Sequence, residues 1–332
     1  MKRIYRYIKI LASAIPPALA LMAGSLAVGF LSAACNKESD PVPSDGRYVI
    51  AFDEVTTKAL ITDETLTSFN VWGETESGKA NVFDGVTITG SKGSAWTYED
   101  DNDVRYWLEN KIYNFFAIAP LGLGTGVVYD PEKGWGVNFN VVESMVADDQ
   151  VDFILAQAQR ITGNITSPPD PVELGFTHKL SKVKLKLKKD NGNADQTITL
   201  KEVYIYGMKG DGTYYLDSGW RLGANITGVS RTNMSEVLGT EYSEIGEALM
   251  IPQSLSEDSV YLIASFDYTN NNEVTTPRIQ IAPIPVDAVD EWEENKTYTY
   301  TAVLSVEHDI VFEGPTIQNW LSHSEGGTIV IK

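Results

Sequence analysis

Apolar and polar residues alternate with a period of two along most of the chain after residue 46, which predicts β-strands. The clearest run, residues 180–188, places Val183, Leu185 and Leu187 on one side and four lysines on the other. We expect a half-buried strand there, with lysines on a wet face that also discourages edge-to-edge pairing. Further runs rich in β-branched and aromatic residues are 48–55, 113–118, 197–206, 260–268 and 297–306.

Turn signals separate these runs. Asp211-Gly212 lies between two tyrosine-bearing segments and predicts a hairpin there. A sustained helical period is almost absent; apart from the stretch 141–160, only 244–250 has room for a helical turn or two. Many short strands divided by Gly, Asn and Asp are typical of all-β sandwiches and not of alternating strands and helices.

The strongest interruption of the strand pattern is Ser167-Pro168-Pro169-Asp170-Pro171, because prolines do not join the interior of a sheet. We therefore divide the chain into a signal peptide (1–34), a flexible linker (35–46), an N-terminal β-sandwich (47–168) and a C-terminal β-sandwich (169–332). The roughly 300 residues that follow the signal peptide are long enough for two cores of about 150 residues each.

The first 34 residues read as an export signal. Four basic residues come first, no ionisable side chain lies between Ile10 and Ala34, and small residues precede Cys35. Cys35 is the only cysteine, so its position after the signal predicts lipidation of its thiol, as in a bacterial lipoprotein. A plain signal peptide and an uncleaved membrane helix are the alternatives. Each of these readings places the rest of the chain outside the cytoplasm.

The exported part is strongly acidic. Removing the signal takes away four of the 26 basic residues and none of the 45 acidic ones. The exported part therefore carries 22 basic and 45 acidic residues, a net charge of −23. Such a charge disfavours nucleic acid and anionic lipid surfaces as partners. With a single cysteine the chain has no internal disulfide, so its stability must come from packed cores.

Candidate chemistry is sparse. The three histidines form no zinc motif, no GxSxG nucleophile elbow occurs, and the acidic run 99–103 lacks the glycine and the distal glutamate of a calcium loop. No pair of carboxylates stands out for glycoside hydrolysis. We predict no catalytic residue, no metal and no cofactor, and hence no enzyme.

A series of motifs nevertheless resembles one known family. In chain order they are Trp107 followed by YNFFAIAP (113–120), QVDFILA (150–156), VELGFTHKLSK (172–182), MIPQ (250–253), Trp292 with Lys296, Tyr298 and Tyr300, and finally Ile310, Phe312 and Trp320. In this order and spacing the chain resembles the fimbrillins, which are subunits of type V pili. The resemblance implies two tandem transthyretin-like sandwiches. His178, inside one motif, is expected to be a satisfied, partly buried histidine and not a ligand.

The resemblance also implies export as a lipoprotein to the outer membrane, followed by proteolytic removal of the first strand and replacement of that strand by one from another subunit. On this chain the removable strand is 48–55, with Tyr48, Ile50 and Phe52 facing one way, and we expect Ile50 and Phe52 to be buried. Lys58 is the expected cleavage site and Arg47 the second candidate. Cleavage in the family generally follows arginine, so lysine at this position departs from the pattern.

The C-terminal residues 328–332 are either a donor strand or the last strand of their own sandwich, and their shortness favours the second. That favours a tip or accessory pilus subunit at the cell surface, whose partners are other pilus subunits and a host or bacterial glycan or protein. An alternative function is a lipid-anchored glycan-binding module. It rests on Trp96, Tyr98, Tyr106 and Trp107, which would form an exposed aromatic patch beside the acidic run.

Overall fold

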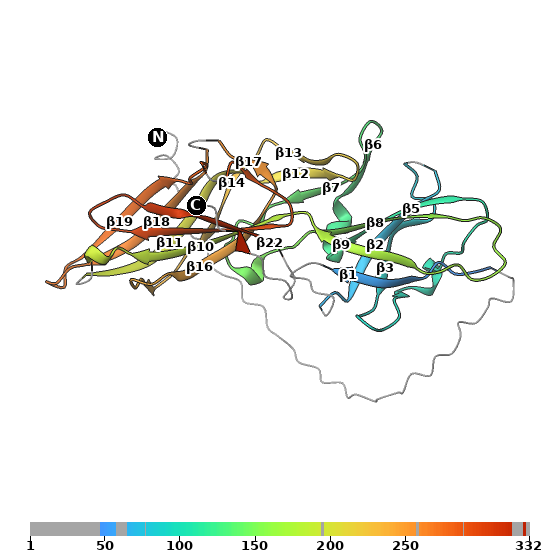
Figure 1. Cartoon of the computed structure of the whole chain (residues 1–332), viewed down its shortest axis with the longest axis horizontal. Coiled ribbons are helices and arrows are strands. Elements are labelled where there is room, and N and C mark those ends of the chain that lie inside the picture. The colour runs from blue at the N-terminus through green and yellow to red at the C-terminus, as the bar shows by residue number, and fades with distance from the viewer. Residues whose placement is uncertain are drawn as a thin grey trace, which may run out of the picture. The chain divides into compact units, whose positions relative to one another are not determined.

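The computed structural model describes residues 47–57, 65–76, 78–193, 196–256, 259–287, 289–320 and 328–329. Within these ranges the fold is all-β, which confirms the expected class (Figure 1). The helical elements there are short 3-10 turns: η1 (Asp101–Asp103), η2 (Leu121–Gly126), η3 (Ala147–Asp149) and η4 (Asn191–Asn193).

A seven-stranded sheet forms the N-terminal part of the fold. Its spatial order is β1 (Phe52–Thr57), β9 (Val172–His178), β8 (Ile154–Ile161), β5 (Ile112–Ala119), β2 (Ser68–Glu74), β3 (Phe83–Thr89) and β4 (Thr97–Tyr98). Its neighbours pair antiparallel except β1 and β9, which run parallel. The central strands β2 and β5 are buried on both faces over most of their length. The sequence of β5 is accordingly a nearly continuous apolar run, whereas β2 buries the polar side chain of Asn70.

Two further sheets are built from the C-terminal part of the chain. One has the order β16 (Ser243–Met250), β10 (Ser181–Lys189), β21 (Lys296–Leu304), β22 (Val311–Asn319) and β23 (Thr328–Ile329). The other has the order β14 (Ile226–Arg231), β11 (Thr197–Lys209), β18 (Tyr261–Thr269) and β19 (Thr275–Pro283), with β15 (Glu236–Val237) also on β11. A two-stranded ladder joins β17 (Gln253–Ser254) to β20 (Glu291–Trp292).

A four-stranded sheet combines strands from both sides of the proline-rich segment. Its order is β13 (Gly219–Leu222), β12 (Asp211–Tyr215), β7 (Gly134–Asn140) and β6 (Val127–Asp130). Figure 1 shows the β6–β7 pair beside β12 and β13. The hairpin expected at Asp211-Gly212 is therefore wrong: β12 pairs with β13 and with the distant β7, and not with β11.

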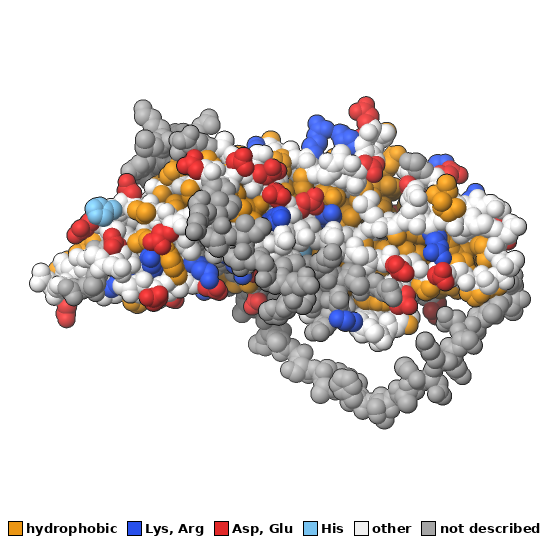
Figure 2. All heavy atoms as spheres, in the orientation of Figure 1, with side chains coloured by type: hydrophobic (Ala, Val, Ile, Leu, Met, Phe, Trp, Pro, Cys, Tyr) orange, Lys and Arg blue, Asp and Glu red, His pale blue; other side chains and the backbone are white. Residues whose placement is uncertain are grey.

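Two hydrophobic clusters make up the core. One contains Ile50 and Phe52 together with one face of β2, β3 and β5 and the inner side chains of β9. The other begins on the opposite face of β2 and β5, at Trp72 and Phe116, and continues through β7 and β12 into both C-terminal sheets. The described residues from 47 onward belong to one compact unit by their contacts, and Figure 2 shows acidic and basic side chains scattered over its visible face.

Residues 172–178, which the sequence analysis assigns to the C-terminal sandwich, pair with β1 and β8, and Val172, Leu174 and Phe176 belong to the first cluster. Leu180 belongs to the second. The division into tandem sandwiches at residue 168 stays a prediction, while the hydrogen bonding of β9 joins it to the first sheet.

Strand β10 follows the expected alternation. Val183, Leu185 and Leu187 are buried, and three of the four lysines are half-buried on the other face. The role expected for those lysines is wrong, because β10 pairs on both sides, with β16 and β21, and is not an edge. The lysines instead form ion pairs: Lys184 with Glu247, Lys186 with Glu244, and Lys188 with Glu313. The segment 244–250 is strand β16 and not a helical turn.

Candidate functional site

The N-terminal segment 48–57 lies against two partners in succession. The amide of Ile50 donates to the carbonyl of Arg105 at 2.9 Å, and the amide of Trp107 donates to the carbonyl of Tyr48 at 2.9 Å. The segment then turns to β9, where the Val172 amide donates to the Ala51 carbonyl at 2.8 Å and the parallel β1–β9 ladder begins. Since β1 is the outermost strand of its sheet, removing it would leave the backbone groups of β9 unpaired.

Side chains from the same segment fill the first hydrophobic cluster. Ile50 is fully buried and Phe52 is 4% exposed, as the alternation predicts. The Phe52 ring lies 5.8 Å from that of Phe83, 6.0 Å from Phe69 and 6.4 Å from Phe115, measured between centroids. Val49, on the opposite side of the strand, is 38% exposed. The segment is thus both a sheet edge and a piece of core.

A tyrosine holds the segment from the side. The Tyr98 hydroxyl donates to the Ile50 carbonyl at 2.6 Å. Burial raises the pKa of this phenol well above its usual range, so the hydroxyl stays a donor at any physiological pH. No periodicity signal marks this contact, because it depends on the loop that brings residues 96–107 across the segment.

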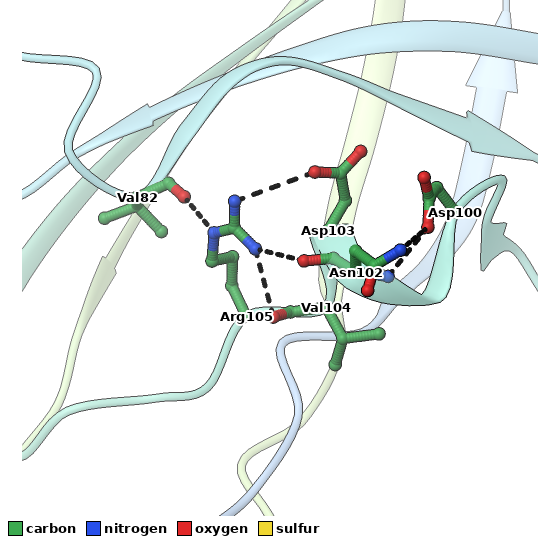
Figure 3. Close-up of polar contacts among 6 residues, drawn as sticks. All are labelled: Val82, Asp100, Asn102, Asp103, Val104 and Arg105. Carbon is green, nitrogen blue, oxygen red and sulfur yellow. Dashed lines mark hydrogen bonds and ion pairs between the residues drawn. The ribbon is translucent and has the colours of Figure 1, made fainter.

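The acidic run 99–103 is ordered by an arginine (Figure 3). Arg105 donates from Nε to the Val82 carbonyl at 3.1 Å and from Nη1 to the carbonyls of Asn102 and Val104, and it lies 3.7 Å from the Asp103 carboxylate. The carboxylate of Asp100 accepts from the backbone and side chain of Asn102. Among the described residues, no three potential metal ligands gather at this loop or elsewhere. The loop's polar groups are used to fix its own shape beside residues 48–50.

The expected aromatic patch is not a surface platform. Trp96 and Trp107 are 8% and 4% exposed, and Trp96 packs on Phe69 at 5.2 Å while Trp107 packs edge-on against Tyr113 at 4.9 Å. Tyr98 and Tyr106 are half-buried. The tryptophans therefore complete the first core, which removes the feature that favoured a glycan-binding surface at this place.

Two of the sequence-based site residues cannot be placed. Cys35 and Lys58 both lie outside the described residues; the strand β1 ends at Thr57, directly before Lys58. Arg47 is described, and its guanidinium lies 4.3 Å from the centroid of the Tyr106 ring. The assignments of lipidation and cleavage to these residues stay predictions.

A second polar cluster lies where β9 ends and β10 begins. His178 is fully buried, and its Nδ1 lies 3.0 Å from the Asp152 carboxylate, in keeping with the expected structural role. Lys182 is 4% exposed, lies 3.5 Å from Glu247, and has its pKa lowered by burial. The pairing with Asp152 could not be anticipated from sequence, since 26 residues separate it from His178.

At the C-terminal end, β23 pairs antiparallel with β22 of the same chain, with Ile329 opposite Ile317. Residues 330–332 lie outside the described part. In that described part, none of the helical elements has the length and apolar character required to traverse a lipid bilayer.

A family model described as fimbrillin-like matches residues 57–320. The chain belongs to the fimbrillin-like family. This confirms the resemblance drawn from the sequence motifs and makes the chain, at the level of its family, a pilus subunit. A comparison with curated proteins finds no match.

Solved structures share the fold. A fimbrial protein from Bacteroides vulgatus superposes with a TM-score of 0.62 at 15% identity, over 82% of this chain and 99% of that one. A candidate cell adhesion protein from Bacteroides ovatus gives a TM-score of 0.55 at 16% identity, over 84% and 99%. One from Bacteroides uniformis gives 0.50 at 17% identity over the same shares.

Proposed function

We propose that the chain is a pilus subunit that assembles by strand exchange after its segment up to Lys58 is removed. The observation that carries the proposal is the position of residues 48–57: their last six residues, β1, form the edge of the seven-stranded sheet, and Ile50 and Phe52 belong to its core. Their departure would uncover the unpaired edge of β9 and the rings around Phe52 at once. A strand from another subunit would satisfy both, by backbone hydrogen bonds and by side chains that refill the pocket.

Two further observations support this cleavage position. Strand β1 ends at Thr57, so a cut after Lys58 would release the whole strand and leave the strands that follow it. The family match also begins at residue 57, so all but the last two residues of the segment that would be lost lie ahead of the part that resembles the family. Cleavage after Arg47 would instead leave the strand in its groove.

The subunit is proposed to be exported with its signal peptide and anchored through a lipid on Cys35. We favour a tip or accessory position over a stalk position, because the residues of β23 pair within their own chain and Lys58 departs from the arginine usual at the family's cleavage site. The fimbrial and adhesion descriptions of its structural relatives support a location at the cell surface, with other pilus subunits as partners. None of these roles requires catalysis.

N-terminal sequencing of the protein recovered from the cell surface tests the cleavage site. We expect a chain that starts at Ala59, and we expect Lys58→Gln to abolish that start while Arg47→Gln, the matched control, leaves it unchanged. Assembly is read in parallel by size-exclusion chromatography of the cleaved and uncleaved forms.

The proposal requires that only the cleaved form makes higher oligomers and that an added peptide of residues 47–57 inhibits them. A surface protein that starts at Tyr48 or Cys35 would rule out Lys58 as the site. Cleaved protein that stays monomeric would rule out strand exchange.

A further inference from the structure

A cleft of about 480 Å³ opens where β2 and β3 meet η2 and the β6–β7 pair. Its walls combine two indole rings, Trp72 and Trp135, with two polar side chains, Asn70 and Asp84. It lies apart from the N-terminal segment, on the face of β2 that belongs to the second hydrophobic cluster. Its size falls in the range usual for small-molecule sites, which combine apolar walls with a few placed polar groups.

Asn70 leaves one polar atom facing this cleft. The side chain is 9% exposed, and its Nδ2 donates to the Gly85 carbonyl and to the Thr87 hydroxyl, both at 3.1 Å. These two bonds fix the orientation of the amide and use both of its hydrogens. Its Oδ1, which faces Gly124, receives no hydrogen bond from any described residue. A fixed acceptor that reaches the cleft without a donor from the protein is suited to a hydroxyl from outside.

The absence of a side chain at residue 124 keeps that acceptor open. A Cβ at Gly124 would lie 2.7 Å from Asn70 Oδ1 and 3.2 Å from Cη2 of Trp72. Gly85, on the other side of the same ring, would place its Cβ 3.1 Å from Trp72 Cζ2. Trp72 is 5% exposed, so it contributes to the cleft only the part of its benzo edge that the lack of side chains at Gly85 and Gly124 leaves uncovered. The same lack of a side chain at Gly124 keeps the amide oxygen open.

The indoles are held rigidly by their surroundings. Trp72 stacks on Phe116 with centroids 5.3 Å apart and planes 5° from parallel. Trp135 is half-buried, and its Nε1 donates to the Glu74 carboxylate at 2.9 Å. Tyr129, which is 40% exposed, packs against Trp135 at 5.1 Å and extends the aromatic surface toward solvent. A ligand would find these rings already placed, which lowers the entropic cost of binding.

We propose that this cleft binds a neutral saccharide unit. A sugar ring presents C–H groups on its faces and hydroxyls on its edge, which match the half-buried Trp135 indole and the edge of Trp72 beside an amide oxygen and a carboxylate. Asp84 is exposed, so its carboxylate would accept hydrogen bonds from sugar hydroxyls, and no lysine or arginine lies among the residues that line the described cleft. An anionic sugar would meet the Asp84 charge without a compensating cation, so acidic saccharides are excluded from the ligand class.

The test uses saturation-transfer NMR on the purified full-length protein with galactose, mannose, N-acetylglucosamine and glucuronate as probes. At least one neutral sugar should bind, with a millimolar dissociation constant typical of one ring in an open cleft, and glucuronate should not. Gly124→Ala should weaken that binding at least about tenfold, because its methyl group covers Asn70 Oδ1.

Gly122→Ala is the matched control, since it lies in the same turn and its Cβ would meet nothing within 4 Å. Asp84→Asn is a second variant that keeps the shape of an exposed side chain and removes its charge. It should weaken the binding of neutral sugars without increasing the stability of the fold. Failure of all three neutral sugars to bind, equal binding of glucuronate, or full retention of binding by both Gly124→Ala and Asp84→Asn would overturn the proposal.

Discussion

The imidazole of His178 stacks on the indole of Trp320, with ring centroids 3.7 Å apart and planes 12° from parallel. Lys182 also contacts that indole, with its ammonium 4.7 Å from the ring centroid. Trp320 follows the last residue of β22, whereas His178 ends β9 and Lys182 belongs to β10. One C-terminal ring therefore ties together the end of the first sheet and the beginning of the next.

Replacing Trp320 tests how much this ring stabilises the fold. Trp320 is 4% exposed, so Trp320→Ala should lower the free energy of unfolding by about 3–5 kcal/mol. The matched control is Val311→Ala at the first residue of β22, which is 54% exposed and should change stability by less than about 0.5 kcal/mol. Urea unfolding measures both. A Trp320→Ala protein as stable as the control would show that the stack contributes little.

Phe52 should be a main stabilising contact of the N-terminal segment. Phe52→Ala should cost about 2–5 kcal/mol, because the ring leaves a cavity among Phe69, Phe83 and Phe115. Val49→Ala, three residues earlier on the exposed side, is the control and should be nearly neutral. Phe52→Ala should also speed proteolysis of the segment in the native protein. If Phe52→Ala and Val49→Ala unfold at the same denaturant concentration, the segment is not part of the core.

Buried tyrosines make the fold sensitive to alkali. Burial raises the pKa of Tyr298 to about 12, against about 10 in an unfolded chain. Above pH 10 the unfolded state releases this proton first, so the free energy of unfolding falls as pH rises from 10 to 12. The share of Tyr298 is about 1 kcal/mol at pH 11.

Tyr298→Phe should therefore show a smaller loss of stability between pH 9 and pH 11 than the parent protein, as measured by urea unfolding at each pH. The variant also lacks the hydrogen bond that the Tyr298 hydroxyl accepts from the Glu293 amide, so it should be less stable at pH 7. Parallel stability curves for the two proteins across this range would contradict the assignment.

Cys35 should carry the lipid anchor. Because it is the only cysteine and follows the apolar segment, growth with a clickable fatty-acid analogue should label the parent protein and not Cys35→Ser. Ser32→Ala, which leaves the cysteine in place, serves as the control and should retain the label. Equal labelling of the parent and Cys35→Ser would exclude this cysteine as the attachment site.

Local alternation was a good guide wherever burial on one face decides a strand. Val183, Leu185 and Leu187 were predicted to share a face and do, and Ile50 and Phe52 were predicted to be buried and are. These predictions need only the period of two, because successive side chains of a strand point to opposite faces whatever its partners are. The motif series likewise identified the family from the chain alone.

The partners of each strand were beyond the reach of the sequence. The lysines of β10 suggested a wet edge, yet ion pairs to Glu247, Glu244 and Glu313 allow the strand to lie in the middle of its sheet. A local turn signal at Asp211-Gly212 suggested a hairpin, yet the backbone groups of β12 are satisfied by β7, more than seventy residues earlier. Hydrogen bonds between distant strands leave no mark in a local window.

The sequence by itself determined the all-β class, the positions of the most clearly alternating strands and the family, because these follow from side-chain periodicity and from residues read in order. Only the tertiary structure decided that Trp96 and Trp107 lie inside the core, and that Trp72, Trp135 and Asn70 meet around an open cleft. An aromatic residue on a strand looks the same in the sequence whether its side chain lies in the core or lines an open cleft. Whether that side chain faces solvent or another sheet depends on which distant segments pack against it, and that is settled by the burial of the whole chain at once.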